Sequence, residues 1–403
     1  MPDTIDHSQG DAGRAVSVGA GTHSAENEDS SRGRKGLGLD WIILPLIAAA
    51  TIGCLYVGTK LYTRMEFVHL GMLPGRCIAQ SGSVYHGVPN SVCTERDNHG
   101  RIVEYRFNSC GDRTSLDCGR KPEGTYRIVL IGSSNPMGYG VPLQSTLAER
   151  LSVELSRRTG RRVEVYNASL NGVGIPANLA TEMPRIMALQ PDLILWVMSS
   201  WDFHPDTVQG EVQEEPSLGN PLELSKLRLP FPGARPSRLL REILYRSQSL
   251  YTAAYLRKIR NDAQAHATSD DEERERMRLI SLNVKTIVDQ AKENGVPVVG
   301  AFLPERAGTE AYLMNPCPKG VAADELNYEL NAILSSEGAI FVDVLPDLRK
   351  TLNLDGLYDP LGAHLNAEGH AFLTQLLANA LTSGKVPALF ERQDTKGEGA
   401  QTN

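Results

Sequence analysis

The sequence predicts an α/β domain, a flavodoxin-like three-layer α/β/α sandwich with a five-stranded parallel sheet. Short apolar segments of the buried-strand type alternate along the chain with longer amphipathic segments of the helical type. This alternation is typical of a parallel sheet whose two faces are both covered by helices. Hydrophobic residues make up 41% and charged residues 22% of the 403 residues, a balance that suits a globular core.

The apolar segments expected to form the strands of this sheet are 127–132, 161–167, 191–200, 296–304 and 339–345. Helices are expected over 143–160, 178–190, 276–295 and 366–381. In the first of these helices leucines recur at every fourth residue from Leu143 to Leu155, so they share one helix face. Gly160 is expected to end that helix, and Asn366 is expected to cap the last helix at its N-terminus.

The chain is expected to have five parts. Residues 1–40 and 386–403 are expected to be disordered tails, because such polar segments bury too little surface to offset the entropy of ordering. Between them we expect a membrane helix over 41–60, a cysteine-containing lead-in over 61–125 and the α/β domain over 126–385. Within that domain, residues 205–269 break the alternation of strands and helices, which indicates an insertion that forms a lid, a docking surface or ordinary packing.

The segment Trp41–Thr59 contains no charged residue. At about 1.5 Å per residue, its length is close to the ~30 Å hydrocarbon core of a bilayer. We therefore predict a single-pass helix in the cytoplasmic membrane, with a cytoplasmic tail before it and the α/β domain on the extracytoplasmic side. A buried core helix and a cleaved signal peptide are the alternatives.

The cysteines that follow the span are Cys77, Cys93, Cys110, Cys118 and Cys317. Their spacing matches no usual metal pattern, so disulfides in an oxidising compartment are expected, with the pairing left open; a zinc site is the alternative. Neither a metal nor a cofactor is expected. The net charge of −7 and the pI near 5.8 argue against a nucleic-acid partner, which would require a basic surface.

A serine and a histidine are placed where a parallel sheet would bring them together. Ser133 and Ser134 follow the first strand, and His364 comes just before the last helix. Sites in such sheets form beyond the carboxyl ends of the strands. Acyl transfer by serine requires a nucleophile, a base and preorganised oxyanion donors. We therefore predict Ser134 as nucleophile and His364 as base, with Ser133 as the alternative nucleophile and a plain strand-to-helix turn as the alternative to a site.

At this point the chain resembles the SGNH (GDSL-type) hydrolase superfamily over about residues 126–381. The resemblance is carried by four blocks in the family's order, "IGSSNPMGYGV", "NASLNGVG", "PDLILWVMSSWDF" and "HLNAEGH". It implies that Ser134 is the nucleophile, that His364 is the base and that the Gly172 amide binds the oxyanion. The upstream "YRFNSCGDRT" is similar to the lead-in of membrane-anchored members associated with surface polysaccharide acylation.

Four positions depart from the family pattern. Ser133 replaces the aspartate before the nucleophile, and Ser199 replaces the glycine of the third block. Trp201 replaces the asparagine that donates to the oxyanion, and Leu361 stands where the orienting aspartate is usual. As replacements we expect Trp201 and Asn135 to contact the oxyanion or substrate, and Asp359 to orient His364. Asp202 is expected to hold the loop after the third strand.

The function expected from this combination is a membrane-anchored serine esterase or O-acyltransferase. Its implied substrate is an acylated carbohydrate or another small ester, most plainly an acetyl ester of a surface or exported polysaccharide. Partners in a polysaccharide-modifying assembly are implied as well. The alternative is a catalytically degenerate domain that binds a glycan or serves as a scaffold, with Trp201 stacking on a sugar ring. A lipid esterase or thioesterase would need an apolar acyl groove under the insertion.

Overall fold

The structure is a computed structural model, and it divides the chain into two units, Met1–Gly58 and Thr59–Asn403. The ranges that it describes are 40–67, 77–81, 84–96, 102–170, 173–203, 270–304, 306, 323–351, 355–359 and 364–390. Most of the predicted tails and the predicted insertion, as well as Gly172, Leu361 and Cys317, lie outside these ranges.

The second unit is built on a five-stranded parallel sheet, as the sequence predicts, and the strand order in the structure is β6-β5-β7-β8-β9. The strands are β5 (Tyr126–Gly132), β6 (Val163–Asn167), β7 (Leu193–Ser199), β8 (Val298–Leu303) and β9 (Ile340–Val342). Every residue of β5 and β7 is buried, because both strands lie inside the sheet and both faces are covered.

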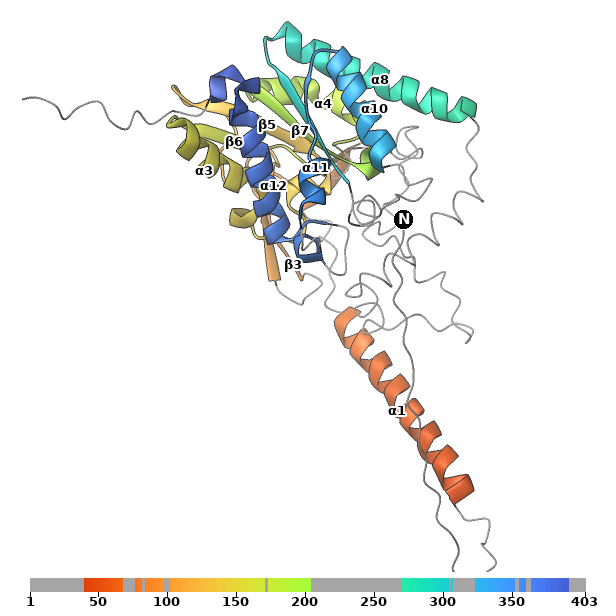
Figure 1. Cartoon of the computed structure of the whole chain (residues 1–403). Coiled ribbons are helices and arrows are strands. Elements are labelled where there is room, and N and C mark those ends of the chain that lie inside the picture. Colours follow the sequence, from red (N-terminus) through yellow and green to blue (C-terminus); the bar gives the residue numbers. More distant parts are fainter. Residues whose placement is uncertain are drawn as a thin grey trace, which may run out of the picture. The chain divides into compact units, whose positions relative to one another are not determined.

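Helices cover the sheet (Figure 1), and an apolar core lies on each of its two faces. In β5, Val129 and Ile131 join one core, and Ile128 and Leu130 join the other, as the period of two in a strand requires. The first core also receives side chains from α4 (Pro176–Ala188), α8 (Asp270–Glu293) and α10 (Ala323–Ser336). The second core receives them from α3 (Leu147–Thr159), α11 (Leu345–Arg349) and α12 (Ala367–Ala380). The predicted three-layer arrangement is therefore confirmed.

The expected ends of two helices are confirmed by their geometry. Gly160 follows α3 in the left-handed region, at a φ of 65°, which glycine adopts without strain. The side chain of Asn366 accepts hydrogen bonds from the backbone N–H groups of Glu368 and Gly369 at the start of α12.

The lead-in region contains regular structure that the sequence did not predict. It forms two antiparallel hairpins, from β1 (Ile78–Ser81) and β2 (Val84–Gly87), and from β3 (Val92–Arg96) and β4 (Ile102–Arg106). The predicted disulfides are present in the described part as Cys77–Cys93 and Cys110–Cys118. Val103, Tyr105 and Phe107 belong to the first core, so this region is part of the domain and not a separate lead-in.

The helix α1 (Asp40–Phe67) includes the segment expected to cross a membrane. Within the part of the chain that the structure describes, no helix is long and apolar enough to span a bilayer. The predicted transmembrane helix is therefore not confirmed.

The end of the domain differs from the expectation. The structure continues through η4 (Leu381–Lys385) and the 3₁₀ turn η5 (Pro387–Leu389), where a disordered tail was expected to begin at residue 386. Val386 and Leu389 are buried in the second core. Their apolar contacts order a short segment whose sequence has no helical or strand period of its own.

Candidate active site

The turn after β5 is shaped by a glycine that no other residue could replace without strain. Gly132 has a φ of +152°, and a Cβ placed on it would overlap the carbonyl oxygen of Val197 and the ring of Pro136. The chain then enters the short helix α2 (Ser134–Met137). This tight turn places Ser134 beyond the carboxyl end of a buried strand, where sites in parallel sheets form.

The two serines of this turn have different surroundings. Ser133 is buried, and its hydroxyl donates a hydrogen bond to Oδ1 of Asp202. Ser134 is half-buried, and its hydroxyl contacts His364 instead. An attacking hydroxyl has to be reachable by substrate and close to a base, so the surroundings favour Ser134 over Ser133 as the nucleophile.

Ser134 and His364 lie 230 positions apart in the sequence and meet in the structure. Nε2 of His364 is 2.7 Å from Oγ of Ser134, a hydrogen-bond distance. His364 comes just before α12, so this contact brings the start of that helix close to the turn that follows β5. If the neutral ring carries its proton on Nδ1, Nε2 is free to accept the proton of Ser134. The contact brings together a hydroxyl and an imidazole, the two groups that acyl transfer by serine requires.

The residues that follow these two side chains are also joined. The side-chain oxygen of Asn135 accepts a hydrogen bond of 3.0 Å from the backbone N–H of Leu365. Asn135 is buried, so this bond is shielded from water. The expected contact of Asn135 with an oxyanion stays a prediction, since the bond that the structure shows uses its oxygen to hold the segment of His364.

Asp359 lies next to His364 through the backbone. Its N–H donates a hydrogen bond of 2.8 Å to the carbonyl oxygen of His364, beside the bridge between Tyr358 and Leu365. Burial lowers the pKa of His364 to about 4, and the negative charge of Asp359 acts against this by raising it. The imidazole is therefore neutral at pH 7, as a general base has to be. The electrostatic influence agrees with the predicted orienting role of Asp359, which stays a prediction.

Asp202 joins the turn of the nucleophile to the end of β7. It is fully buried in η2 (Ser200–Phe203), and besides Ser133 it accepts hydrogen bonds from the N–H and the hydroxyl of Ser199, at 2.8 and 3.0 Å. Burial raises the pKa of Asp202 to about 6, while these three bonds lower it. A Cβ on Gly174 would come within 2.8 Å of both Ser133 and Asp202, so a glycine leaves room for this contact. The expected structural role of Asp202 is borne out by these bonds.

The structure describes only some of the other groups that were predicted to bind the oxyanion. Trp201 is half-buried in η2, directly before Asp202, and thus at the same edge of the sheet as Ser134. Gly172 lies outside the described residues. The backbone N–H of Ser134 is at the first position of α2, where the geometry of a helix leaves amides without an intrahelical acceptor. That amide is available to a developing negative charge on a substrate oxygen.

One aromatic contact of the site was not anticipated. The rings of Tyr139 and His364 have centroids 4.8 Å apart and are tilted by 40°. Tyr139 lies in the loop after α2, between Gly138 and Gly140, both in the left-handed region. The sequence signal was the pattern Gly-Tyr-Gly directly after the serine turn, which marks a tightly bent loop around an aromatic side chain.

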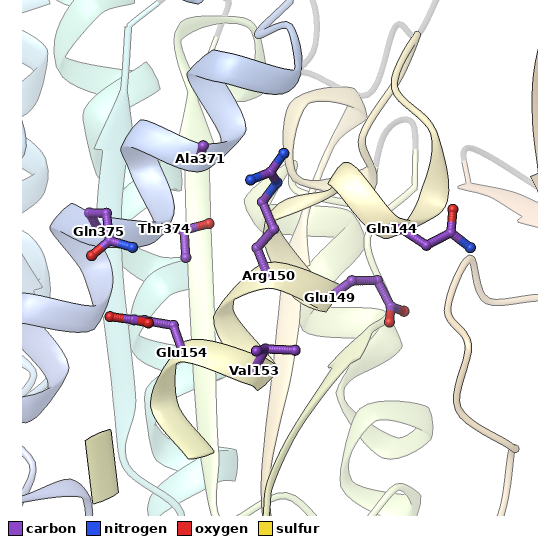
Figure 2. A pocket seen from close by; sticks show the side chains of 8 residues that line it. All are labelled: Gln144, Glu149, Arg150, Val153, Glu154, Ala371, Thr374 and Gln375. Atoms are coloured by element: carbon purple, nitrogen blue, oxygen red, sulfur yellow. The ribbon is translucent and has the colours of Figure 1, made fainter. Parts of the chain in front are cut away.

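A cavity of about 400 Å³ lies between α3 and α12 (Figure 2). It is lined by Gln144, Glu149, Arg150, Val153, Glu154, Ala371, Thr374 and Gln375. Neither Ser134 nor His364 contributes to this lining, and the candidate catalytic pair is therefore separate from it. Among the described residues, no group of three or more His, Cys, Asp or Glu side chains is placed to hold a metal ion.

Comparisons with known proteins find similar solved structures, many of them SGNH or G-D-S-L lipases and acylhydrolases. A lipase/acylhydrolase from Enterococcus faecalis is 13% identical with a TM-score of 0.35, over 64% of this chain and 95% of that one. An acetyl xylan esterase is 11% identical with a TM-score of 0.37, over 63% and 99%. The psychrotrophic esterase EstA from Pseudoalteromonas is 10% identical with a TM-score of 0.36, over 64% and 97%.

Neither a protein-family model nor a curated protein matches the chain. The similar structures have identities and TM-scores too low to carry any conclusion about activity or substrate. The class that the fold and the site define is an α/β domain with a serine and a histidine in hydrogen-bond contact beyond the carboxyl edge of its sheet.

Proposed function

We propose that this protein is an SGNH-type serine esterase or O-acyltransferase. The observation that carries the proposal is the distance of 2.7 Å between Oγ of Ser134 and Nε2 of His364. Ser134 is half-buried, so that a substrate carbonyl can reach it, and His364 is neutral at pH 7 because burial lowers its pKa to about 4. A nucleophile next to a neutral base at the functional edge of a parallel sheet fits acyl transfer.

The reaction proposed for this pair has two halves. Oγ of Ser134 attacks the ester carbonyl while Nε2 of His364 takes the hydroxyl proton, and the carbonyl oxygen becomes an oxyanion held by the Ser134 amide. The C–O bond to the alcohol then breaks, and the alcohol leaves with the proton from His364. Water attacks the acyl-serine in the hydrolase, and a sugar hydroxyl attacks it in the transferase. In either case His364 takes the proton and returns it to Ser134.

Three further residues complete the proposal. The amide of Gly172 and the indole N–H of Trp201 are the expected additional donors to the oxyanion, and Asp359 is the expected partner of His364. Removing one such donor typically costs about 100- to 1000-fold in turnover. The turnover of the enzyme therefore depends on whether the indole N–H of Trp201 donates to the oxyanion as the asparagine of the family does.

The proposed substrate is a small acyl ester, with acetyl on a surface or exported polysaccharide as the first choice. This part rests on the resemblance of the four sequence blocks and of the upstream segment. The two disulfides of the described region favour an oxidising compartment outside the cytoplasm, because cytosolic thiols are kept reduced. Partners in a polysaccharide-modifying assembly are proposed on the same resemblance.

The test is to incubate the purified full chain with a fluorophosphonate probe and with p-nitrophenyl acetate. We expect labelling and acetate release that are lost in Ser134→Ala and in His364→Gln. Ser383→Ala, which changes an exposed serine of η4, is the matched control and should be labelled as the wild type is. Labelling that persists in Ser134→Ala would contradict the proposal.

A glycan-binding function without catalysis is the second candidate, favoured by the partial exposure of Trp201 at the site. A protein that is not labelled, but whose binding to an acetylated polysaccharide is abolished by Trp201→Ala, would support this candidate instead.

A further inference from the structure

The loop that carries Tyr139 is held by the disulfide-containing hairpin region that lies upstream of β5 in the chain. The hydroxyl of Tyr139 donates a hydrogen bond of 2.8 Å to Oε1 of Glu95. Glu95 is on β3, 44 positions earlier in the chain. The ring of Tyr139 at the same time packs on the imidazole of His364. A carboxylate of the upstream hairpin thus reaches the candidate base through one intervening side chain.

The hairpin presents Glu95 on its inner face. In the register of β3 and β4, Cys93 pairs with Tyr105 and Glu95 pairs with Val103. Side chains alternate along a strand, so that Cys93 and Glu95 point to the same side. Cys93, Val103 and Tyr105 are buried, and Cys93 is bonded to Cys77. The disulfide therefore fixes the face of the hairpin from which Glu95 contacts Tyr139.

Two further contacts hold the same loop. The hydroxyl of Tyr105 accepts a hydrogen bond of 2.7 Å from the N–H of Gly140, the residue after Tyr139. The buried guanidinium of Arg113 donates to the carbonyl oxygens of Met137, Gly138 and Val141, and it stacks on the ring of Tyr105 at 4.2 Å. The backbone on both sides of Tyr139 is thus fixed by residues of the upstream region, which leaves its ring a narrow range of positions against His364.

We propose that Glu95 and Tyr139 are positioning residues for His364, and that the hairpin of β3 and β4 is a component of the active site. The proposal deepens the proposed function and rests on it for the role of His364. Tyr139 covers one face of the imidazole and keeps Nε2 directed at Ser134. Glu95 holds Tyr139 in that place.

A cover of this kind has an electrostatic consequence that can be measured. The ring of Tyr139 excludes water from the imidazole, and a desolvated imidazole resists protonation. Among the described residues, the titratable groups near His364 include Asp359, whose charge raises its pKa, the neighbouring His370 of α12, and Tyr139. Removing the ring lets water approach and should raise the pKa of His364 from about 4 towards the ordinary value of 6.5.

The decisive experiment is an NMR titration of the histidines in the free full chain, with the signal of His364 assigned by its loss in His364→Gln. We expect Tyr139→Ala to raise the pKa of His364 by about one unit or more. Tyr126→Phe, which removes a tyrosine hydroxyl at the start of β5, is the control and should leave that pKa where it is. Because this readout requires no turnover, it stays informative if the proposed enzyme activity is absent.

The kinetic arm separates the role of the hydrogen bond from that of the ring. Tyr139→Phe keeps the ring and removes the hydroxyl, and Glu95→Leu removes its acceptor. Each should lower kcat/KM about tenfold, since one charge-assisted hydrogen bond is lost. The double variant should lose clearly less activity than the sum of the two single losses, because both changes remove the hydrogen bond between Glu95 and Tyr139. Glu95→Gln keeps an acceptor oxygen and should retain most of the activity.

The outcomes distinguish the two proposals. A raised pKa of His364 in Tyr139→Ala, in a protein without labelling that depends on Ser134, supports the positioning role and contradicts the proposed esterase. An unchanged pKa in Tyr139→Ala, or fully additive losses in the Glu95→Leu and Tyr139→Phe pair, overturns the positioning role whether or not the protein is an enzyme.

Discussion

The side-chain oxygen of Asn135 accepts a hydrogen bond from the backbone N–H of Leu365, and so the residue after Ser134 is tied to the residue after His364. Two segments that are 230 positions apart thereby share a buried hydrogen bond next to the contact between hydroxyl and imidazole. The bond links the two backbones that carry Ser134 and His364, so a shift of either backbone would alter the contact between these side chains.

The first prediction concerns the hydrogen bond between Asn135 and Leu365. Asn135→Ala removes the acceptor and leaves the buried N–H of Leu365 unpaired, which should cost about 1–3 kcal/mol of stability. It should also lower kcat on p-nitrophenyl acetate about tenfold or more, because a displaced imidazole is a poorer base. Asn135→Asp keeps an acceptor oxygen and is the matched control. Equal kcat values for Asn135→Ala and the wild type would show that the hydrogen bond of Asn135 does not position His364.

The second prediction concerns the pH dependence of activity. Because burial lowers the pKa of His364 to about 4, the base is neutral above that pH, and kcat/KM should fall only as the pH drops through about 4. Asp359→Asn removes a charge that raises this pKa, so the acid limb should move to lower pH. If Asp359 also orients the imidazole, kcat should drop by up to about 10⁴-fold.

The measurement for this prediction is a pH profile of kcat/KM for the wild type and for Asp359→Asn. Asp347→Asn is the control, since Asp347 is an exposed acid of α11 that pairs with Lys350. An acid limb at the ordinary pKa of 6.5 in the wild type would show that the imidazole is solvated in solution.

The third prediction concerns Asp202 and stability. Burial raises its pKa from 3.8 to about 6, so the folded protein binds a proton more tightly than the unfolded chain does. The contribution of this group to stability is complete below about pH 4 and is lost as the pH rises through 6. The loss amounts to about 3 kcal/mol, the equivalent of a shift of about two units.

Asp202→Asn should therefore remove the part of the pH dependence of stability that comes from Asp202. Urea unfolding of both proteins at pH 4 and at pH 7 measures it, and the difference between variant and wild type cancels the opposite contributions of His364 and His370, whose pKa values burial lowers. We expect the variant to gain stability relative to the wild type between these two pH values. A difference that does not change with pH would show that Asp202 stays charged when buried.

The fourth prediction concerns the disulfides. Replacing Cys77 and Cys93 with serine opens a loop with a sequence separation of 16, which should cost about 3 kcal/mol of unfolding free energy. The pair of Cys110 and Cys118 closes a separation of 8 and should cost about 0.6 kcal/mol less. Urea unfolding of the two double variants tests both values. Two variants as stable as the wild type would show that packing alone holds the hairpins in place.

Much of the fold and part of the site followed from local sequence patterns. The strands β5 and β7 are short apolar segments. The expected Gly160 follows the last residue of α3, and the expected Asn366 caps the start of α12. Ser134 and His364 were identified because the ends of parallel strands meet at one edge. These features are local, or they follow from a general rule of parallel sheets, and no particular side-chain packing is needed to predict them.

The sequence alone established the parallel α/β architecture, the location of the serine turn and the presence of disulfides, while the structure supplied their pairing. Tertiary structure decided which contacts hold those parts together. Hydrogen bonds join Asn135 to Leu365 and Ser133 to Asp202. Tyr139 is hydrogen-bonded to Glu95 and packs on the ring of His364. Such contacts join residues that are tens to hundreds of positions apart, and they depend on strand register and on which faces pack. Periodicity and turn chemistry report the state of the chain over a few neighbouring residues, so only the packed domain determines which distant side chains meet.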